Sequence, residues 1–255
     1  MRIMDFKIVH IDETDSTNGW LREFVQQRDG SFVTSGGVTK EPSLCCMAEY
    51  QTAGQGCGSN SWESERGKNL TFSVLLHPTE IPADCQFRIS EAVSVAICET
   101  LEQLFSPISA TIKWPNDIYV GDRKICGILI ENQLRGRLIS DSIVGIGLNV
   151  NQTEFRSDAP NPVSIAQITG QEEDREALLQ AFLQQLSVTM EMEPEALMAA
   201  YRSRLYRREG IHRFSDSQGE FEAKVLNVLD DGRLVLLDAE GKARMYAFKE
   251  VQFVI

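Results

Sequence analysis

Three neighbouring segments decide the fold: Lys124-Ile-Cys-Gly-Ile-Leu-Ile-Glu131, Leu134-Arg-Gly-Arg137 and Ile143-Val-Gly-Ile-Gly-Leu-Asn-Val150. The first and third are nearly continuous apolar runs of strand length, a pattern typical of strands buried on both faces of a sheet. The short segment between them has the composition of a hairpin connection. Together they predict an antiparallel pair of strands inside a larger sheet.

Other apolar patterns extend this sheet and cover it with helices. Short apolar runs at 44–48, 70–76 and 111–114 predict further strands. Apolar side chains spaced three and four residues apart predict helices over 89–105, 178–186 and 197–205. Pro107 is expected to end the first helix. The sequence therefore predicts an α/β (α+β) fold in which helices pack on a mixed β-sheet.

The pattern changes near Ile211. Short alternating segments follow, separated by the turn sequences Asp230-Asp-Gly232 and Glu240-Gly-Lys242, and they predict a small all-β barrel. We expect two domains, 1–210 and 211–255. Residues 152–162 are polar and contain two prolines, so they are predicted to form a mobile loop that can close over a site.

Composition narrows the class of partner and the cellular location. The net charge is −12 and no basic run occurs, which argues against DNA as the main partner. Residues 1–20 lack the features of a secretory signal, and no apolar stretch reaches membrane-spanning length, so we expect a cytoplasmic protein. Six scattered cysteines are expected to stay reduced. The three histidines are too far apart in sequence to indicate a zinc site.

A glycine-rich segment, Glu49-Tyr-Gln-Thr-Ala-Gly-Gln-Gly-Cys-Gly-Ser-Asn-Ser-Trp62, follows one of the predicted strands. Glycines let backbone N–H groups approach an anion closely. An ordinary surface turn explains the same glycines equally well. The segment matches neither GxxxxGK[ST] nor the GxGxxG pattern that precedes a helix.

A second polar segment, Lys113-Trp-Pro-Asn-Asp117, ends a short apolar run. It places a cation, an amide and a carboxylate at one sheet edge, where they can hold a nucleotide and its magnesium. By itself the pattern favours a capped turn around Pro115. Lys124 then adds a positive group before a buried strand, and Gly127 leaves room for a ligand to approach.

The third segment, 144–150, carries Gly145 and Gly147 within an apolar strand and ends near Asn149. Glycines inside a strand indicate close approach by another backbone or by a ligand. Asn149 can hydrogen-bond a sugar or a phosphate. A β-bulge with a turn-forming Asn is the alternative explanation.

In this order, the segments resemble the motifs of the biotin protein ligase family. Thr14-Asp-Ser-Thr-Asn18 is similar to the family's early Ser-Thr-Asn motif, and 49–62 to its glycine-rich loop. The segments 113–117, 124–131 and 145–149 resemble its Lys-Trp-Pro-Asn-Asp, Lys-x-x-Gly-Ile-Leu-x-Glu and nucleotide-side motifs. The resemblance implies an α/β catalytic domain with an SH3-like C-terminal barrel. It also implies an enzyme that converts biotin and ATP to biotinyl-5′-AMP and transfers biotin to a lysine of a biotin carboxyl carrier protein.

The resemblance also implies roles for individual residues. Lys124 is the expected catalytic residue, touching the biotin carboxylate and the α-phosphate, and Asp117 the expected Mg²⁺ ligand. The expected biotin-binding residues are Ser16, Thr17, Asn18, Gln51, Gly54, Gln55, Gly56, Cys57, Lys124 and Gly127. The expected ATP-binding residues are Trp62, Lys113, Asn116, Asp117 and Asn149.

Two departures from the family pattern bear on function. Family members usually carry arginines in the glycine-rich loop, whereas residues 54–60 contain none, so Arg66 or Lys68 could compensate only if the loop folds back. The family's frequent N-terminal DNA-binding helices are missing, so no repressor role is expected.

Two other functions compete with biotin ligation. A lipoate protein ligase shares the chemistry, but its Arg-Arg and Ser-Gly-Gly segments are absent. A non-catalytic biotin- or nucleotide-binding regulator is the alternative of a different class. Homodimerisation through an exposed strand stays open at this point.

Overall fold

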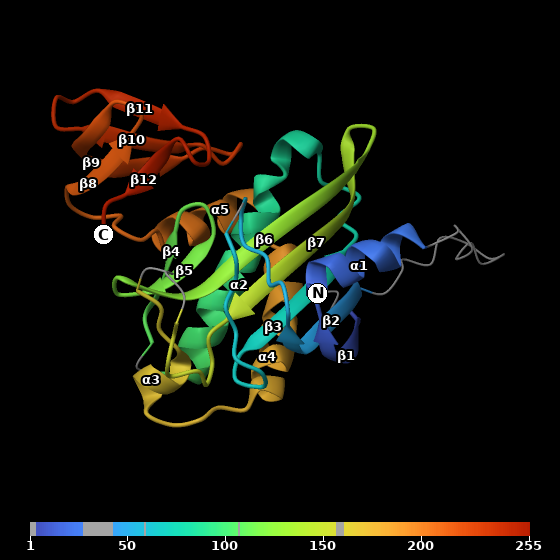
Figure 1. Ribbon diagram of the computed structural model, residues 1–255. Coiled ribbons are helices and arrows are strands. Elements are labelled where there is room, and N and C mark those ends of the chain that lie inside the picture. Colours follow the sequence, from blue (N-terminus) through green and yellow to red (C-terminus); the bar gives the residue numbers. More distant parts are fainter. Residues whose placement is uncertain (1–3, 28–42, 59, 107, 157–160) are drawn as a thin grey trace.

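The computed structural model describes residues 4–27, 43–58, 60–106, 108–156 and 161–255 and contains two β-sheets (Figure 1). The larger sheet has seven strands in the order β1-β2-β3-β7-β6-β5-β4. Only β1 and β2 pair in parallel, and the other neighbours are antiparallel, so the predicted mixed sheet is confirmed. Its strands are β1 (Phe6–Thr14), β2 (Ser43–Gln51), β3 (Leu70–Leu76), β4 (Ala110–Lys113), β5 (Asp117–Val120), β6 (Arg123–Arg135) and β7 (Leu138–Leu148).

The predicted hairpin consists of the two longest strands of this sheet. Strands β6 and β7 pair from Cys126 opposite Leu148 to Arg135 opposite Leu138. Gly136 turns the chain between them with a φ of 66°, a left-handed conformation that glycine adopts without steric cost. The two apolar runs that decided the fold therefore form one antiparallel ladder in the centre of the molecule.

The two faces of the large sheet carry different residues because side chains alternate along a strand. Phe72 and Val74 of β3 face the main hydrophobic core, together with Val144 and Ile146 of β7. Ser73, between the two β3 core residues, points to the opposite face, where it contacts helix α1 (Thr17–Gln26). That opposite face also carries Gly127 of β6 with Gly145 and Gly147 of β7. Small and polar residues there leave room for a cavity.

Helices cover the two faces unequally. The apolar face packs against α2 (Phe87–Leu104), α4 (Arg175–Met190) and α5 (Pro194–Ser203), which correspond to the three predicted helices. Among the described helices, α1 alone covers the other face, through a smaller cluster built around Leu21. Pro107, which was expected to end the first predicted helix, lies outside the described residues; the helix itself ends at Leu104.

The second sheet comprises β8 (His212–Asp216), β9 (Gly219–Val228), β10 (Leu234–Asp238), β11 (Ala243–Tyr246) and β12 (Val251–Phe253). Its order is β11-β10-β9-β8-β12 and every pairing is antiparallel. The predicted small all-β unit is therefore confirmed, but the pairings among the described residues leave β11 and β12 as edges and do not close a barrel. Trp114 Nε1 donates to Gly232 O at 2.8 Å and so joins the two sheets.

Several elements were not predicted. Strands β1 and β5 were missed, as were α1, the short helix α3 (Ile165–Thr169) and the 3₁₀ turn Ala83–Cys85. Of the predicted mobile loop 152–162, residues 157–160 lie outside the described residues. Its described flanks are hydrogen-bonded: Gln152 Nε2 donates to Glu154 O at 2.8 Å, and Lys124 N donates to Asn161 O at 2.8 Å.

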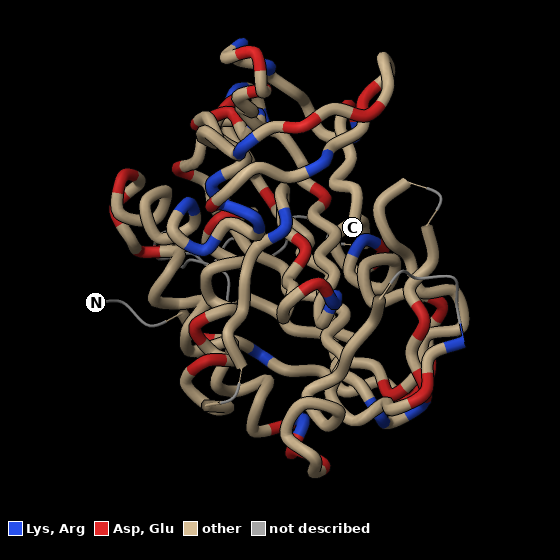
Figure 2. Tube along the Cα trace, turned by 90° about the vertical axis from the view of Figure 1, so that its left-hand side faces the viewer, with Lys and Arg blue, Asp and Glu red and all other residues tan. Residues whose placement is uncertain are grey.

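Charge is distributed over the whole chain. Figure 2 shows acidic residues along the trace from one end of the molecule to the other, with basic residues lying among them. Among the described helices, none is both long enough and apolar enough to cross a membrane.

Candidate active site

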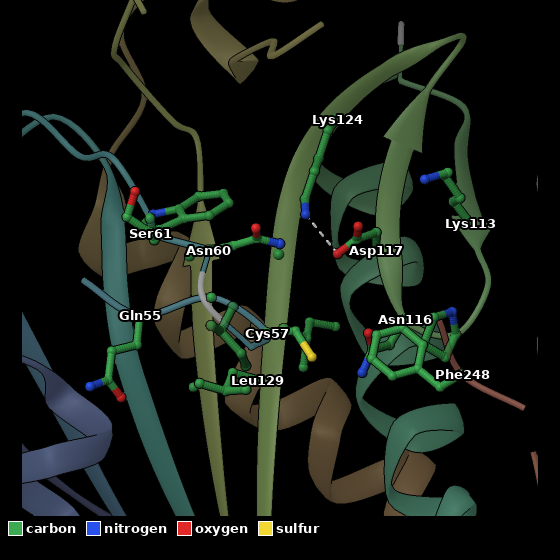
Figure 3. A pocket seen from close by; sticks show the side chains of 18 of the residues that line it. Gln55, Cys57, Asn60, Ser61, Lys113, Asn116, Asp117, Lys124, Leu129 and Phe248 are labelled. Carbon is green, nitrogen blue, oxygen red and sulfur yellow. Dashed lines mark ion pairs between the residues drawn. The ribbon is translucent and has the colours of Figure 1, made fainter. Parts of the chain in front are cut away.

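A cavity of about 820 Å³ lies over the face of the large sheet that carries the glycines (Figure 3). Its lining comes from segments far apart in the sequence: the start of α1, the glycine-rich loop, the β4–β5 turn, the first half of β6, β7 and the C-terminal sheet. The lining residues are Ser16, Thr17, Asn18, Gln51, Gln55, Gly56, Cys57, Asn60, Ser61, Trp62, Lys113, Trp114, Pro115, Asn116, Asp117, Tyr119, Lys124, Gly127, Ile128, Leu129, Gly145, Ile146, Gly147, Phe248, Lys249, Val251, Gln252, Phe253 and Ile255.

The middle of the cavity floor is built on glycine. Gly127 of β6 pairs with Gly147 of β7, and the indole ring of Trp62 lies against both. A Cβ atom at Gly127 would lie 2.8 Å from the ring, and one at Gly147 would overlap it. Gly145 makes similar room for the amide of Asn18. The close approach predicted from these glycines is therefore made by the side chains of Trp62 and Asn18. The alternative explanation, a β-bulge at the glycines, does not apply, because the shift in register of this ladder lies at Gln133 and Leu134.

One end of the cavity is a network of neutral polar groups around the start of α1. Ser16 caps the helix, because its hydroxyl accepts a hydrogen bond from Gly19 N. Gln51 Oε1 accepts from Thr17 N at 2.8 Å and from Thr17 Oγ1 at 3.0 Å. Ser73 Oγ lies 2.7 Å from Thr17 Oγ1 and 2.6 Å from Asn18 Oδ1. We call Ser16, Thr17, Asn18, Gln51 and Ser73 the neutral end.

Charged residues behind the neutral end fix its orientation. Asn18 Nδ2 donates to Glu131 Oε2 at 2.8 Å, and Arg22 Nη2 donates to both oxygens of the same carboxylate at 2.8 and 3.0 Å. Because Glu131 accepts from the amide nitrogen, the amide oxygen of Asn18 points toward Ser73. The ion pair between Arg22 and Glu131 thus directs the amide nitrogen of Asn18 to Glu131 and its amide oxygen to Ser73.

The glycine-rich loop folds as a small hairpin. Trp62 N donates to Gly54 O at 2.9 Å, and Gly56 N donates to Asn60 O at 2.8 Å. Gln55 and Ser61 form an isolated antiparallel β-bridge between them. A Cβ at Gly54 would lie 2.5 Å from Trp62 O, so only glycine fits this pairing. Gly54 therefore shapes the loop without lining the cavity, whereas Gln55, Gly56 and Cys57 line it.

The other end of the cavity is charged. Lys124 Nζ pairs with Asp117 Oδ1 at 2.8 Å, and Figure 3 shows this pair on the side of the pocket opposite Gln55 and Ser61. The same ammonium lies 5.9 Å from the ring centroid of Trp62. The backbone of Lys124 is fixed because its N–H donates to Asn161 O and its C=O accepts from Val163 N. We call Lys113, Asn116, Asp117 and Lys124 the charged end.

Lys113 occupies an aromatic site within the charged end. Its ammonium lies 5.3 Å from the ring centroid of Tyr119 and 5.5 Å from that of Phe253. Burial lowers the pKa of Lys113, partly opposed by the negative charge of Asp117. An anion bound here would raise the pKa of Lys113 again, because opposite charge favours the protonated amine.

The oxygen ligands of the charged end fit one magnesium ion that takes most of its ligands from water and from substrate phosphates. Within the described residues, no group of three or more His, Cys, Asp or Glu side chains could hold a metal by itself. Asp117 offers one carboxylate and Asn116 one amide carbonyl. Mg²⁺ usually keeps several waters and binds one or two carboxylates together with substrate phosphates. The site therefore fits a magnesium ion that arrives with a nucleotide.

Most of the predicted site residues meet in this one cavity, and two do not line it. Gly54 lies behind the loop, as described above. Asn149 is buried, and its Nδ2 donates to Val163 O at 3.1 Å, which holds the segment that flanks Lys124. Its contact with ATP stays a prediction.

Sequence reasoning missed two groups of site residues. Ser73, Glu131 and Arg22 organise the neutral end; Ser73 was detectable as a polar residue inside the apolar run 70–76. Phe248, Lys249 and Phe253 come from the C-terminal sheet and reach the cavity only through tertiary packing.

Neither of the proposed substitutes for loop arginines reaches the cavity. Arg66 pairs with Asp12 and Glu13 on the far side of the loop. Lys68 Nζ pairs with Glu172 Oε1 at 2.7 Å. Compensation by either residue was expected only if the loop folds back, and in this structure both side chains are paired outside the cavity.

Comparison with known proteins agrees with these features. The model of the Biotin/lipoate A/B protein ligase family matches residues 36–149. The Bifunctional ligase/repressor BirA of Bacillus subtilis is 31% identical over 223 residues, covering 79% of this chain and 63% of the relative. The Biotin--[acetyl-CoA-carboxylase] ligase of Mycobacterium tuberculosis is 26% identical over 203 residues, covering 77% of this chain and 73% of the relative. The chain thus spans less than two thirds of the length of the Bacillus relative.

The fold also has solved counterparts. The biotin protein ligase from Aquifex aeolicus in complex with biotin and ATP superposes with a TM-score of 0.75 at 24% sequence identity. The match covers 97% of this chain and 99% of that one. At this identity the likeness establishes the fold of both sheets and no more.

Proposed function

Because the chain belongs to the Biotin/lipoate A/B protein ligase family, we propose that it is a biotin protein ligase. In this proposal it uses ATP to convert biotin to biotinyl-5′-AMP and then transfers biotin to one lysine of a biotin carboxyl carrier protein. Because the reaction consumes ATP and modifies a metabolic carrier, we place the enzyme in the cytoplasm.

One observation carries the proposal: a single cavity joins the neutral end to the charged end. Biotin has a neutral polar ring system at one end and a carboxylate at the other. The neutral end offers hydrogen-bonding groups held by Gln51, Ser73 and Glu131. The charged end offers Lys124 and Lys113, which suit the carboxylate and the phosphates. The cavity thus matches both parts of the acid and leaves space for a nucleotide.

The first half-reaction brings two anions together, so it needs positive charge at the reacting atoms. A carboxylate oxygen of biotin attacks the α-phosphorus, forming a new P–O bond as the bond to the leaving pyrophosphate breaks. Lys124 is the group that we assign to this charge, since its ammonium can leave Asp117 for the carboxylate and the α-phosphate. Trp62, whose ring lies against Gly127 and Gly147, is the residue that we assign to positioning ATP.

Asp117 and Asn116 are the residues that we assign to the magnesium ion. When bound with ATP, Mg²⁺ supplies neutralisation of phosphate charge. In the second half-reaction, the amine of the carrier lysine attacks the acyl carbon of the mixed anhydride and AMP leaves. The glycine-rich hairpin, by lying over the cavity, excludes water from the anhydride.

The proposal is tested by the intact mass of a purified biotin-acceptor domain after incubation with this protein, Mg²⁺ and ATP. Parallel reactions contain biotin or lipoate, and a control acceptor has its target lysine replaced by arginine. One biotin adduct that requires ATP and the target lysine is expected. A lipoate adduct would identify a lipoate ligase instead, and no adduct with either acid would favour a non-catalytic binding protein.

A further inference from the structure

A tight turn of the C-terminal sheet carries a lysine in an unusual backbone conformation. Residues 247–250 connect β11 to β12, with Glu250 N donating to Ala247 O at 3.1 Å and Ala247 N donating to Glu250 Oε2 at 2.7 Å. Within this turn Lys249 has a φ of 72°, a left-handed conformation that favours glycine. Non-glycine residues held in this region cluster at functional sites, and the conformation persists because the surrounding structure holds it.

The side chain of Lys249 reaches the tip of the glycine-rich loop. A Cβ added at Gly58 would lie 2.5 Å from Lys249 Nζ, and both Lys249 and the neighbouring Cys57 line the cavity. Gly58 itself has a φ of 73°. A loop of this kind turns backbone N–H groups toward an anion. The ammonium therefore lies beside the tip of this loop, at the wall of the cavity.

The charge of Lys249 is available to a ligand. The other two lysines of the cavity are engaged, Lys124 with Asp117 and Lys113 with two aromatic rings. For Lys249 the described part of the chain provides only the ring of Phe248, at 5.8 Å, and no carboxylate within ion-pair distance. An exposed lysine without an acidic partner, facing a loop that lacks its own cation, is a site for a phosphate group.

We propose that Lys249 is a phosphate-binding residue of the active site, supplied by the C-terminal sheet to the glycine-rich loop that has no arginine. Its ammonium, together with the backbone N–H of Gly58, holds the phosphates of ATP, and later the phosphate of the adenylate. The inference rests on the proposed function for its role in turnover, but the binding of ATP tests it without turnover.

The test measures ATP binding by isothermal titration calorimetry to the full chain and to variants at position 249, with Mg²⁺ present. Loss of one charge-assisted hydrogen bond is expected to weaken ATP binding on the order of tenfold in Lys249→Ala. Lys249→Arg keeps the charge and should stay within about twofold of the unaltered chain. Lys242→Ala, an exposed lysine of the same sheet that lies outside the cavity, is the matched control.

A second variant separates binding from folding. Lys249→Gly relieves the left-handed backbone, so its Tm should equal or exceed that of the unaltered chain while ATP binding is still lost. Adding Cys57→Arg to Lys249→Ala returns a cation to the loop and should recover most of the affinity. Titrations with AMP and with inorganic pyrophosphate distinguish the α-phosphate from the β- and γ-phosphates as the group bound.

Three results would overturn the inference: equal ATP affinity in Lys249→Ala and the unaltered chain, an equal loss in Lys242→Ala, or a defect confined to the KM for the carrier protein. The last would make Lys249 a contact for the acceptor. If the unaltered chain binds ATP through Lys249 yet never biotinylates an acceptor, the proposed function fails while this inference stands.

Discussion

The neutral end and the charged end of the cavity are built on opposite principles. At the neutral end, the hydrogen-bonding groups already have partners within the protein, as in the chain from Gln51 through Thr17 and Ser73 to Asn18. At the charged end, Lys124 is paired with a carboxylate that must release it, and Lys113 is partly buried against rings. The neutral end is thus preorganised for shape and hydrogen bonding, whereas the charged end reaches its full charge balance only with an anion bound.

The largest expected effect is at the charged end. Lys124→Ala removes the cation at the transferring phosphate and should slow adenylate formation by about two orders of magnitude or more. Rapid-quench measurement of biotinyl-5′-AMP in a single turnover provides the test, with Lys7→Ala on the exposed part of β1 as control. A single-turnover rate close to that of the unaltered chain would show that Lys124 does not have its assigned role. It would also contradict the contrast drawn between the two ends.

The next effect is expected at the floor that both ends share. Gly147→Ala would place a methyl group inside the indole of Trp62, so the ring must move away from the sheet. Overpacking of this kind costs about 1–3 kcal/mol, and we expect biotin and ATP both to bind at least about tenfold more weakly. Calorimetric titration with each ligand measures this. Gly121→Ala, whose Cβ would meet no atom within 4 Å but whose φ of 58° strains the backbone away from the cavity, controls for a loss of stability alone. Weakened binding of one ligand alone would show that the floor serves a single end.

A smaller and one-sided effect is expected at the neutral end. Ser73→Ala deletes a buried hydroxyl that contacts Thr17 and Asn18 but does not line the cavity. Loss of one such hydrogen-bond group costs about 1 kcal/mol, so biotin affinity should fall about fivefold to tenfold. The KM for ATP should not change. A parallel rise in that KM would indicate that the two ends are coupled through β3.

The smallest effect on ligand binding is expected from a buried carboxyl that lies outside both ends and affects the stability of the fold. Glu91 of α2 is buried, and burial raises its pKa to about 7, opposed by Arg202 and Arg88 and reinforced by Asp230. Tyr201 also lies close enough for its pKa to be influenced by this carboxyl. Because the pKa is higher in the folded chain, protonation of Glu91 stabilises the fold at low pH, and this contribution decreases between about pH 4.5 and 7.

Glu91→Gln keeps the neutral form at every pH. Relative to the unaltered chain, its Tm should therefore rise as the pH increases from 5 to 8, by an amount that corresponds to at most about 3 kcal/mol. Thermal unfolding at a series of pH values measures the difference. The affinities for biotin and ATP should not change at pH 8, and a changed affinity there would place Glu91 within the influence of the charged end.

Local patterns predicted the central ladder and the three covering helices, because continuous apolar runs and helical spacing are properties of neighbouring residues. Most of the cavity lining was predicted only through the resemblance to the biotin protein ligase family. Strand β1 was missed because its buried and exposed positions do not alternate regularly, and α1 because it starts within a motif that was interpreted only as a binding site. Asn149 carries a second role that its place at a strand end did not indicate: its Nδ2 donates to Val163 O and so holds the neighbouring chain. Lys249 could not be found locally, since its position at Gly58 depends on how the two sheets pack.

The position of Trp62 also gives the protein a built-in optical reporter. The chain has three tryptophans in distinct surroundings: Trp20 is stacked on Phe24 at α1, Trp114 joins the two sheets, and Trp62 lies in the cavity with its indole N–H buried and without a hydrogen-bond partner among the described residues. Indole emission depends on the local field and polarity, and Lys124 lies 5.9 Å from this ring. In the Trp20→Phe variant, which leaves Trp114 and the contact between the two sheets in place, the change in fluorescence on adding ligand would report on the cavity in real time.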